Sequence, residues 1–231
     1  MTQFIVTFSL FFIAAFPGQL PAQDARTAIH QKAEQVQPLL PGMKAPSFTV
    51  QDVEGNTVAI DPASLEKPLV LTFYRGGWCP FCNMYLAEMR HAEKELTGLG
   101  FDIWFISIDK PELLYASLEQ PDVAYTIYSD SSLDATRAFG LAFRVDDSTY
   151  ERYIGYDINL EEASGETHHV LPAPSTFIIG TDGIINFQYT NPDYKVRLHP
   201  EVLLAAARAY VNEADQRLYR AWKARMKTQQ E

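Results

Sequence analysis

The chemistry-bearing residues of this chain are its two cysteines, Cys79 and Cys82, which stand two residues apart. At this spacing the two sulfurs can close a small disulfide ring, so that one thiol attacks a substrate and the other resolves the adduct. A Cys-x-x-Cys pair next to a strand and a helix is typical of a thioredoxin-like redox motif. The sequence therefore predicts a thiol redox centre in the segment Tyr74-Arg75-Gly76-Gly77-Trp78-Cys79-Pro80-Phe81-Cys82-Asn83.

The residues on either side of this segment predict how the cysteines are positioned. Residues 68–74 are apolar, β-branched or aromatic, which favours a buried strand. After the pair, the spacing of Leu86, Met89 and Leu96 predicts a helix with one apolar face. Pro80 suits the first turn of that helix. The free N–H groups and positive end of a helix favour a thiolate over a thiol.

The cysteines could also serve as metal ligands or form an inert disulfide. A structural zinc site needs four ligands, and besides the cysteines the chain offers five histidines: His30, His91, His168, His169 and His199. The adjacent pair could join the cysteines around zinc or copper, although neighbours in an extended segment point to opposite faces. An inert disulfide is the other alternative, but a ring this short restrains little of the unfolded chain. We therefore expect no bound metal or cofactor.

The N-terminal residues predict export. A nearly unbroken apolar run from Phe4 to Phe16 is too short to span a bilayer comfortably but matches the core of a secretory signal, although no Lys or Arg precedes it. We expect cleavage after Ala22 and an extracytoplasmic mature protein, periplasmic or secreted, without stable membrane association; a buried helix or an uncleaved anchor is the alternative. The net charge of −10 argues against nucleic acid as a partner.

The 231 residues suffice for one domain with a sizeable core and extensions. We divide the chain into a signal peptide (1–22), a lead-in segment (23–40), one domain (41–212) and a C-terminal helical extension (213–231). Strands alternating with helices predict a mainly parallel sheet covered on both faces. The expected strands are 47–50 and 57–60 (a hairpin), 68–74, 101–108, 125–128, and 175–179 with 184–189 (a second hairpin); the expected helices follow the cysteines and cover 113–118, 133–139 and 200–227. Residues 141–170 break the pattern and are interpreted as an insertion that could cover the site.

The order of these motifs resembles the alkyl hydroperoxide reductase and thiol-specific antioxidant family, and within it the peroxiredoxin-like branch that carries Cys-x-x-Cys. The resemblance runs from about Pro41 to Ala207 and rests on five motifs: residues 73–82, Ser107-Ile108-Asp109, Ser175-Thr176-Phe177-Ile178-Ile179, Asp182-Gly183 and 191–200. It implies an α/β, thioredoxin-like fold, with a central mixed sheet flanked by helices, an N-terminal hairpin and a C-terminal helix. It also implies a peroxidase that works through a cysteine sulfenic acid, which condenses with a second thiol to a disulfide.

The resemblance leaves the attacking cysteine open. Laid on the peroxiredoxin pattern Pro-x-x-x-Thr/Ser-x-x-Cys, Arg75 falls on the proline, Cys79 on the hydroxyl residue and Cys82 on the peroxidatic cysteine. In thioredoxin-like disulfide enzymes, by contrast, the first cysteine is the nucleophile. Both cysteines belong to the redox centre in either case.

Other side chains are candidates for supporting roles. The arginine that peroxiredoxins carry before Ser175-Thr176-Phe177 is Pro174 here, which looks like the cis-proline that shapes the substrate groove of thioredoxins. Arg75 or Arg144 could replace that arginine, or be an ordinary surface or ion-pair residue. Trp78 could shield the thiolate, recognise a partner or only pack. His168 and His169 could transfer protons near Pro174 or be loop residues without a role.

Three functions remain in order of preference. The first is a thiol-dependent peroxidase that reduces hydrogen peroxide or organic hydroperoxides through Cys79 and Cys82 and is re-reduced by a thioredoxin-like donor. The second is a thiol–disulfide oxidoreductase acting on protein disulfides. The third is a metal-binding or copper-delivery protein using the cysteines with His168 or His169. A homodimer is compatible with all three.

Overall fold

The structure is a computed structural model that describes residues 25–115, 124–212, 222 and 225–227. The predicted signal peptide, the start of the lead-in segment, half of the predicted helix 113–118 and most of the C-terminal extension lie outside these residues. Of the lead-in segment, Ala33–Gln35 form a single 3-10 turn rather than a longer helix. His30 bridges to Phe143 and Leu39 is buried, so this segment packs on the domain.

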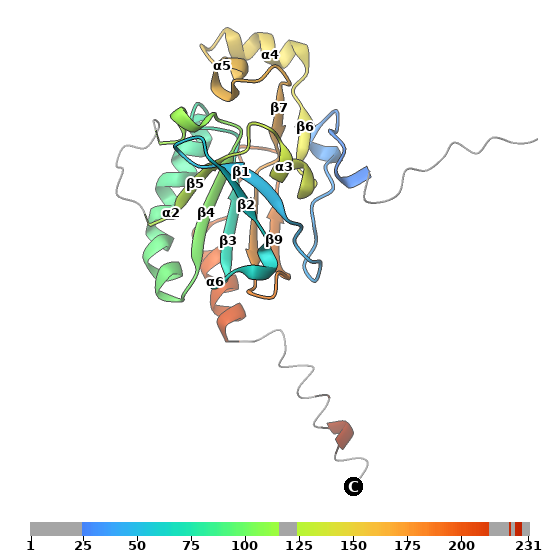
Figure 1. Cartoon of the computed structure of the whole chain (residues 1–231), viewed down its shortest axis with the longest axis vertical. Helices are drawn as coiled ribbons and strands as arrows, with labels where there is room; N and C mark the ends of the chain where they lie inside the picture. Colours follow the sequence, from blue (N-terminus) through green and yellow to red (C-terminus); the bar gives the residue numbers. More distant parts are fainter. Residues whose placement is uncertain (1–24, 116–123, 213–221, 223–224, 228–231) are drawn as a thin grey trace, which may run out of the picture.

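A seven-stranded sheet forms the centre of the molecule, with strand order β2-β1-β5-β4-β3-β8-β9 (Figure 1). The strands are β1 (Phe48–Gln51), β2 (Thr57–Ile60), β3 (Leu69–Phe73), β4 (Asp102–Ser107), β5 (Thr126–Ser129), β8 (Ser175–Ile179) and β9 (Ile185–Thr190). Only β3–β4 and β4–β5 pair in parallel, and the other four neighbouring pairs are antiparallel. The prediction of a mainly parallel sheet is therefore wrong. The two hairpins pair antiparallel because a short turn permits no other pairing, and β1 and β8 also run antiparallel to their other neighbours, β5 and β3.

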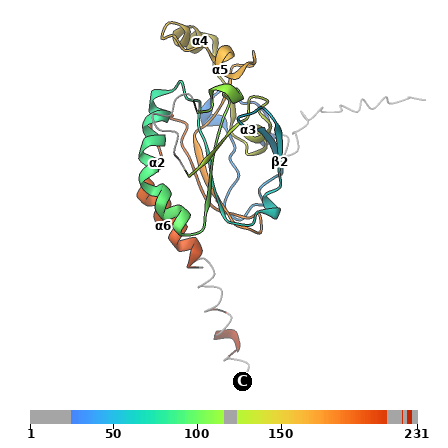
Figure 2. The ribbon, with the colours of Figure 1, turned by 60° about the vertical axis from the view of Figure 1, so that its left-hand side comes forward.

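Helices cover both faces of this sheet, as Figure 2 shows. On one face lie α2 (Pro80–Gly98) and α6 (Pro200–Val211), which also pack on each other. On the other lies α3 (Asp134–Ala138), which packs against β1. Alternate residues of β3 serve the two sides: Val70 belongs to the α2 core, whereas Leu69, Leu71 and Phe73 belong to the α3 core.

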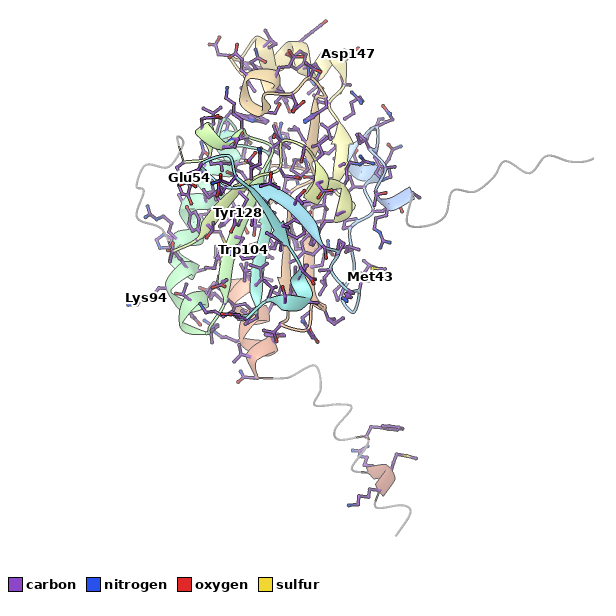
Figure 3. All side chains as sticks on the ribbon, in the orientation of Figure 1. Met43, Glu54, Lys94, Trp104, Tyr128 and Asp147 are labelled. Atoms are coloured by element: carbon purple, nitrogen blue, oxygen red, sulfur yellow. The ribbon has the colours of Figure 1, made fainter. Side chains whose placement is uncertain are left out.

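Two adjacent strands in the middle of the sheet carry an aromatic pair. Trp104 on β4 and Tyr128 on β5 lie next to each other on the sheet (Figure 3), with ring centroids 5.5 Å apart in an edge-to-face contact. Such cross-strand aromatic pairs stabilise neighbouring strands.

Helix α2 has one apolar and one polar face. Leu86, Met89 and Leu96 are buried, whereas Lys94 projects from the outer face (Figure 3). The predicted amphipathic character of this helix is thus confirmed.

The insertion at 141–170 is ordered. It contains strand β6 (Ala142–Arg144), helices α4 (Asp147–Ile154) and α5 (Leu160–Ser164), and strand β7 (Val170–Pro172), which pairs antiparallel with β6. Its apolar side chains form a third core cluster with Ile108 and Leu133, and Trp78 packs against that cluster. In Figure 1 the two helices sit above one end of the central sheet. That end carries the cysteines.

Within the described residues, none of the helices combines the length and the apolar character needed to cross a bilayer.

Candidate active site

The cysteines lie at the start of α2, as predicted. Cys79 is the N-cap residue and Pro80 the first helical residue, while Cys82 falls in the first turn. Strand β3 delivers the chain to this point, and its end is buried on both sides by the two main cores. Both cysteines are free thiols, and their exposed fractions are only 2% for Cys79 and 0% for Cys82. The two cysteines are therefore thiols that are largely shielded from solvent.

The loop before the helix is held by the backbone of its two glycines. Gly76 has a positive φ of 148°, and a Cβ there would come within 2.3 Å of the Trp78 indole nitrogen. Gly77 donates its N–H to Asp109 Oδ2 at 2.7 Å, and Asn83 Nδ2 donates to the Gly77 carbonyl at 2.8 Å. These contacts tie the loop to the end of β4 and to the first turn of α2.

The two thiols differ in acidity. The pKa of Cys79 falls to about 6, because the Cys82 thiol hydrogen-bonds its sulfur and the Arg75 guanidinium favours the thiolate, against the opposing effect of burial. The pKa of Cys82 rises well above its ordinary value, because burial, the hydrogen bond to Cys79 and the negative charge of Cys79 all disfavour a second thiolate. At neutral pH the stable arrangement is thus a Cys79 thiolate that accepts the Cys82 S–H.

Arg75 lies against Cys79 and is buried, with an exposed fraction of 3%. Its Nη1 donates to Cys79 Sγ at 3.7 Å, and its Nη2 donates to the Tyr153 hydroxyl of α4. The guanidinium carbon lies 4.0 Å from the ring centroid of Tyr194 and 4.9 Å from that of Trp78. Among the described residues no carboxylate pairs with this arginine. Because a buried charge without a counter-ion is costly, the Cys79 thiolate is its natural partner.

Trp78 has a packing role in this structure. Its ring lies 5.9 Å from that of Tyr153, and its indole is half-buried between the loop and the insertion. Together with Tyr153 and Tyr194 it encloses Arg75 on three sides. The prediction that residues 141–170 cover the site is confirmed through Tyr153. The pattern that suggested an insertion could not identify this tyrosine.

Sequence reasoning missed Arg197. It lies in the segment between β9 and α6, and its Nη2 donates to Cys82 Sγ at 3.1 Å. The only signal was its place in the run 191–200, one of the motifs that carry the resemblance. Arg144, which the sequence offered instead, is exposed and donates to the His168 carbonyl. Each cysteine sulfur thus has one arginine beside it, Arg75 for Cys79 and Arg197 for Cys82.

The cis-proline expected at Pro174 is wrong, since no peptide bond among the described residues is cis. The trans form is the default for X–Pro bonds unless the surroundings impose the other. Pro174 is buried and its carbonyl accepts the Asn191 N–H at 3.2 Å. It lines a small cavity together with Tyr85 and Arg197. Its position beside the site is thus as predicted, but its geometry is not that of a thioredoxin groove.

The paired histidines have structural partners. His168 Nε2 lies 3.0 Å from the Ser131 carbonyl oxygen, and its Nδ1 accepts the Val170 N–H. His169 Nε2 lies 2.8 Å from Glu161 Oε1, and its ring stacks on Tyr150. In the part of the chain that the structure describes, no three His, Cys, Asp or Glu side chains are grouped so as to hold a metal ion. These contacts fasten the insertion, and they engage both ring nitrogens of His168 and the Nε2 of His169.

Asp109 is a second residue near the site whose contacts the sequence did not predict, although it lies in the motif Ser107-Ile108-Asp109. It follows β4, is 2% exposed, and its Oδ2 accepts the Gly77 N–H and the Ser107 hydroxyl. Burial raises the pKa of this carboxyl to about 7. Its neighbours with ionisable groups are Tyr74 on the end of β3 and Cys82 on α2, whose negative forms oppose its own.

Asp109→Asn is expected to change the pH dependence of stability. Because the folded pKa is about 7 and lies above the ordinary value of 3.8, the folded state favours the protonated acid. The stability that this gives is complete below about pH 4 and is lost as pH rises through 7. The free energy of unfolding of the wild type should therefore fall relative to that of Asp109→Asn between pH 4 and 8, measured by urea unfolding. Asp147→Asn, at an exposed carboxylate, is the control; a constant difference for Asp109→Asn would contradict this reading.

Comparison with known proteins agrees with the geometry. The AhpC/TSA family model matches residues 41–188. A putative peroxiredoxin of Mycobacterium tuberculosis is 30% identical over 102 residues, which cover 44% of this chain and 64% of that protein. Peroxiredoxin Bcp of Escherichia coli is 28% identical over 167 residues, which cover 72% of this chain and 94% of that protein. The alignment thus spans less than two thirds of the first relative but nearly all of the second.

Solved structures with the same fold include a peroxidoxin, BcpB, of Mycobacterium tuberculosis, with a TM-score of 0.55 and 20% identity over 78% of this chain and 98% of that one. A reduced peroxiredoxin of Vibrio vulnificus in complex with hydrogen peroxide gives a TM-score of 0.59 and 17% identity over 74% and 98%. These likenesses confirm the thioredoxin-like fold with its central mixed sheet.

Proposed function

Since the chain belongs to the AhpC/TSA family, we propose that it is a thiol-dependent peroxidase in which the Cys79 thiolate attacks a hydroperoxide and Cys82 resolves the product. The observation that carries this proposal is the buried Cys79 sulfur, with its lowered pKa and with Arg75, free of any described carboxylate partner, 3.7 Å away. A thiolate is the reactive form of cysteine, and a fixed positive charge stabilises negative charge that develops on the peroxide oxygen.

The first step is the oxidation of Cys79 by the hydroperoxide. The Cys79 sulfur attacks the distal oxygen of ROOH, an S–O bond forms, and the O–O bond breaks. The sulfur is oxidised to sulfenic acid, and the peroxide is reduced to ROH once the leaving alkoxide takes up a proton. In the second step the Cys82 sulfur attacks the Cys79 sulfur, the S–O bond breaks and water leaves, which forms the disulfide. A thioredoxin-like dithiol then returns both cysteines to the reduced form.

Burial of the pair favours a small substrate. Thiol–disulfide exchange, the second candidate, needs a substrate sulfur to approach Cys79 in line with a protein disulfide. With Cys79 only 2% exposed and Arg75, Trp78 and Tyr153 packed around it, a hydroperoxide group fits better than the surface of a protein. The lowered pKa of the first cysteine by itself suits both reactions.

The test compares two activities of the reduced protein. Hydrogen peroxide and an organic hydroperoxide should be consumed catalytically with dithiothreitol or thioredoxin as the reductant, and far faster than by free glutathione at equal thiol concentration. Reduction of insulin disulfides should be slow in the same buffer. Peroxide consumption no faster than that of glutathione, together with rapid insulin reduction, would assign the chain to the second candidate function.

The site of action proposed for this enzyme is outside the cytoplasm. Support comes from the apolar run between Phe4 and Phe16 and from the small residue at Ala22. N-terminal sequencing of the protein purified from its cells is expected to begin at Gln23; a sequence beginning at Met1 or Thr2 would contradict export with cleavage.

A further inference from the structure

Arg197 stands in a fixed position over the second thiol. The segment that carries it is anchored on both sides: Asn191 N–H donates to the Pro174 carbonyl, and Leu198 is buried in the α2 core. The next residue, His199, is the N-cap of α6. The arginine therefore reaches the first turn of α2 from a well-anchored segment, and its Nη2 lies 3.1 Å from Cys82 Sγ.

Among the described residues no carboxylate forms an ion pair with Arg197. Its Nε is buried and has no hydrogen-bond partner among these residues. Its guanidinium carbon lies 5.9 Å from the ring centroid of Tyr85, on α2. The other side chains that line the small cavity, Thr176 and Tyr189 among them, include no carboxylate. Cys82 is thus the group on which its charge acts most directly.

Cys82 needs such help only after the peroxide has reacted. In the reduced site burial raises the pKa of Cys82, and the hydrogen bond to Cys79 and the negative charge of its thiolate raise it further, so that Cys82 stays protonated. Conversion of Cys79 to sulfenic acid removes that negative charge. The Arg75 and Arg197 charges then face one ionisable sulfur, and Arg197 is the one in contact with it.

We propose that Arg197 is the activating residue of the resolving step, which stabilises the Cys82 thiolate as it attacks the Cys79 sulfenic acid. This assignment rests on the proposed order of attack. Cys82 gives up its proton, its sulfur bonds to the Cys79 sulfur, and the sulfenic hydroxide that leaves takes up a proton to form water. The pair of arginines thus divides the reaction, Arg75 serving the peroxide step and Arg197 the disulfide step.

The test follows both steps in a single turnover of Arg197→Gln. One equivalent of hydrogen peroxide is added, and sulfenic acid is trapped with dimedone in samples withdrawn at successive times. Disulfide is counted in samples without dimedone by the loss of the second free thiol, that of Cys82. Sulfenic acid should form within about threefold of the wild-type rate. Disulfide formation should slow on the order of 10- to 100-fold, as expected when a charge that shifts a thiol pKa by one to two units is lost.

Two variants and a pH series separate activation from structure. Arg197→Lys keeps the positive charge and should recover most of the rate, whereas a role in packing or geometry alone would not be recovered. Raising the pH should restore the resolving step in Arg197→Gln, because more of Cys82 ionises without help. Lys195→Gln removes an exposed charge from the same segment and should leave both steps unchanged. If Arg197→Gln does not fold, the Arg197→Lys pH profile decides.

Three results would overturn the proposal. They are loss of the sulfenic step in Arg197→Gln, an unchanged disulfide step, or a slowed disulfide step that neither lysine nor high pH recovers. A peroxide-free assay keeps this test apart from that of the proposed function. The aromatic disulfide 5,5′-dithiobis(2-nitrobenzoate) reports Cys79 attack by its first released thiolate and Cys82 attack by its second. Arg197→Gln should delay only the second release, whether or not peroxide is a substrate.

Discussion

Cys79→Ser should abolish the rapid reaction with hydroperoxides, lowering the second-order rate constant on the order of 1000-fold or more, because a serine hydroxyl is not ionised at neutral pH and cannot take the oxygen atom. Cys82→Ser should keep the first step within about tenfold. Its hydroxyl can still donate a hydrogen bond to the Cys79 thiolate, in place of the thiol that lowers the Cys79 pKa. Without a second thiol, however, that variant should stop at sulfenic acid and turn over once.

Stopped-flow fluorescence of Trp78, which packs beside Arg75, follows this reaction directly at several peroxide concentrations. The rate constant of Cys82→Ser should rise with pH around 6 and then level off, since the Cys79 pKa lies at about 6. The reverse pattern, with rapid oxidation of Cys79→Ser and none of Cys82→Ser, would assign the attack to Cys82 as the peroxiredoxin sequence pattern does.

Phe177→Ala should strongly destabilise the core, lowering the free energy of unfolding by about 3–5 kcal/mol. Phe177 lies at the centre of β8 opposite Leu71 and is 0% exposed. Its ring contacts those of Phe73 and Phe139, with centroids 6.2 and 5.1 Å apart. Removing it leaves a cavity between the sheet and α3 that rigid neighbours cannot fill.

Urea unfolding of the reduced protein measures this loss. Val202→Ala is the matched control, because Val202 is 50% exposed on α6 and its truncation should change stability by no more than about 0.5 kcal/mol. A loss below about 1 kcal/mol for Phe177→Ala would mean that the α3 face of the sheet is not packed as described here.

The order of elements could be predicted from sequence wherever local signals were strong. The β3 and α2 boundaries followed from an apolar run and from helical spacing, and the two hairpins followed from turn residues. The antiparallel pairing of β1 with β5 and of β3 with β8 could not be predicted in this way, because these strands lie far apart in the sequence. Strand β8 pairs with β3 in the sheet although about a hundred residues separate them.

The site shows the same division. The cysteines and their helix start carry a local sequence signature, and Arg75 lies within it. Arg197 and Tyr153 reach the site from 115 and 78 residues away from their partners, so that spacing contains no trace of their contacts. Arg75, one of the two candidates for replacing the arginine absent at Pro174, lies beside Cys79. Arg197 became identifiable only once the fold placed the segment before α6 beside the first turn of α2.

In the proposed mechanism Cys79 attacks the hydroperoxide and Cys82 resolves the sulfenic acid. The most direct measurement treats reduced Cys82→Ser and Cys79→Ser with one equivalent of hydrogen peroxide in the presence of dimedone and locates the adduct by peptide mass spectrometry. A dimedone adduct is expected on Cys79 of Cys82→Ser within seconds. No adduct is expected on Cys82 of Cys79→Ser on that timescale. A rapid adduct on Cys82 of Cys79→Ser, with Cys79 unmodified in the other variant, would contradict this mechanism.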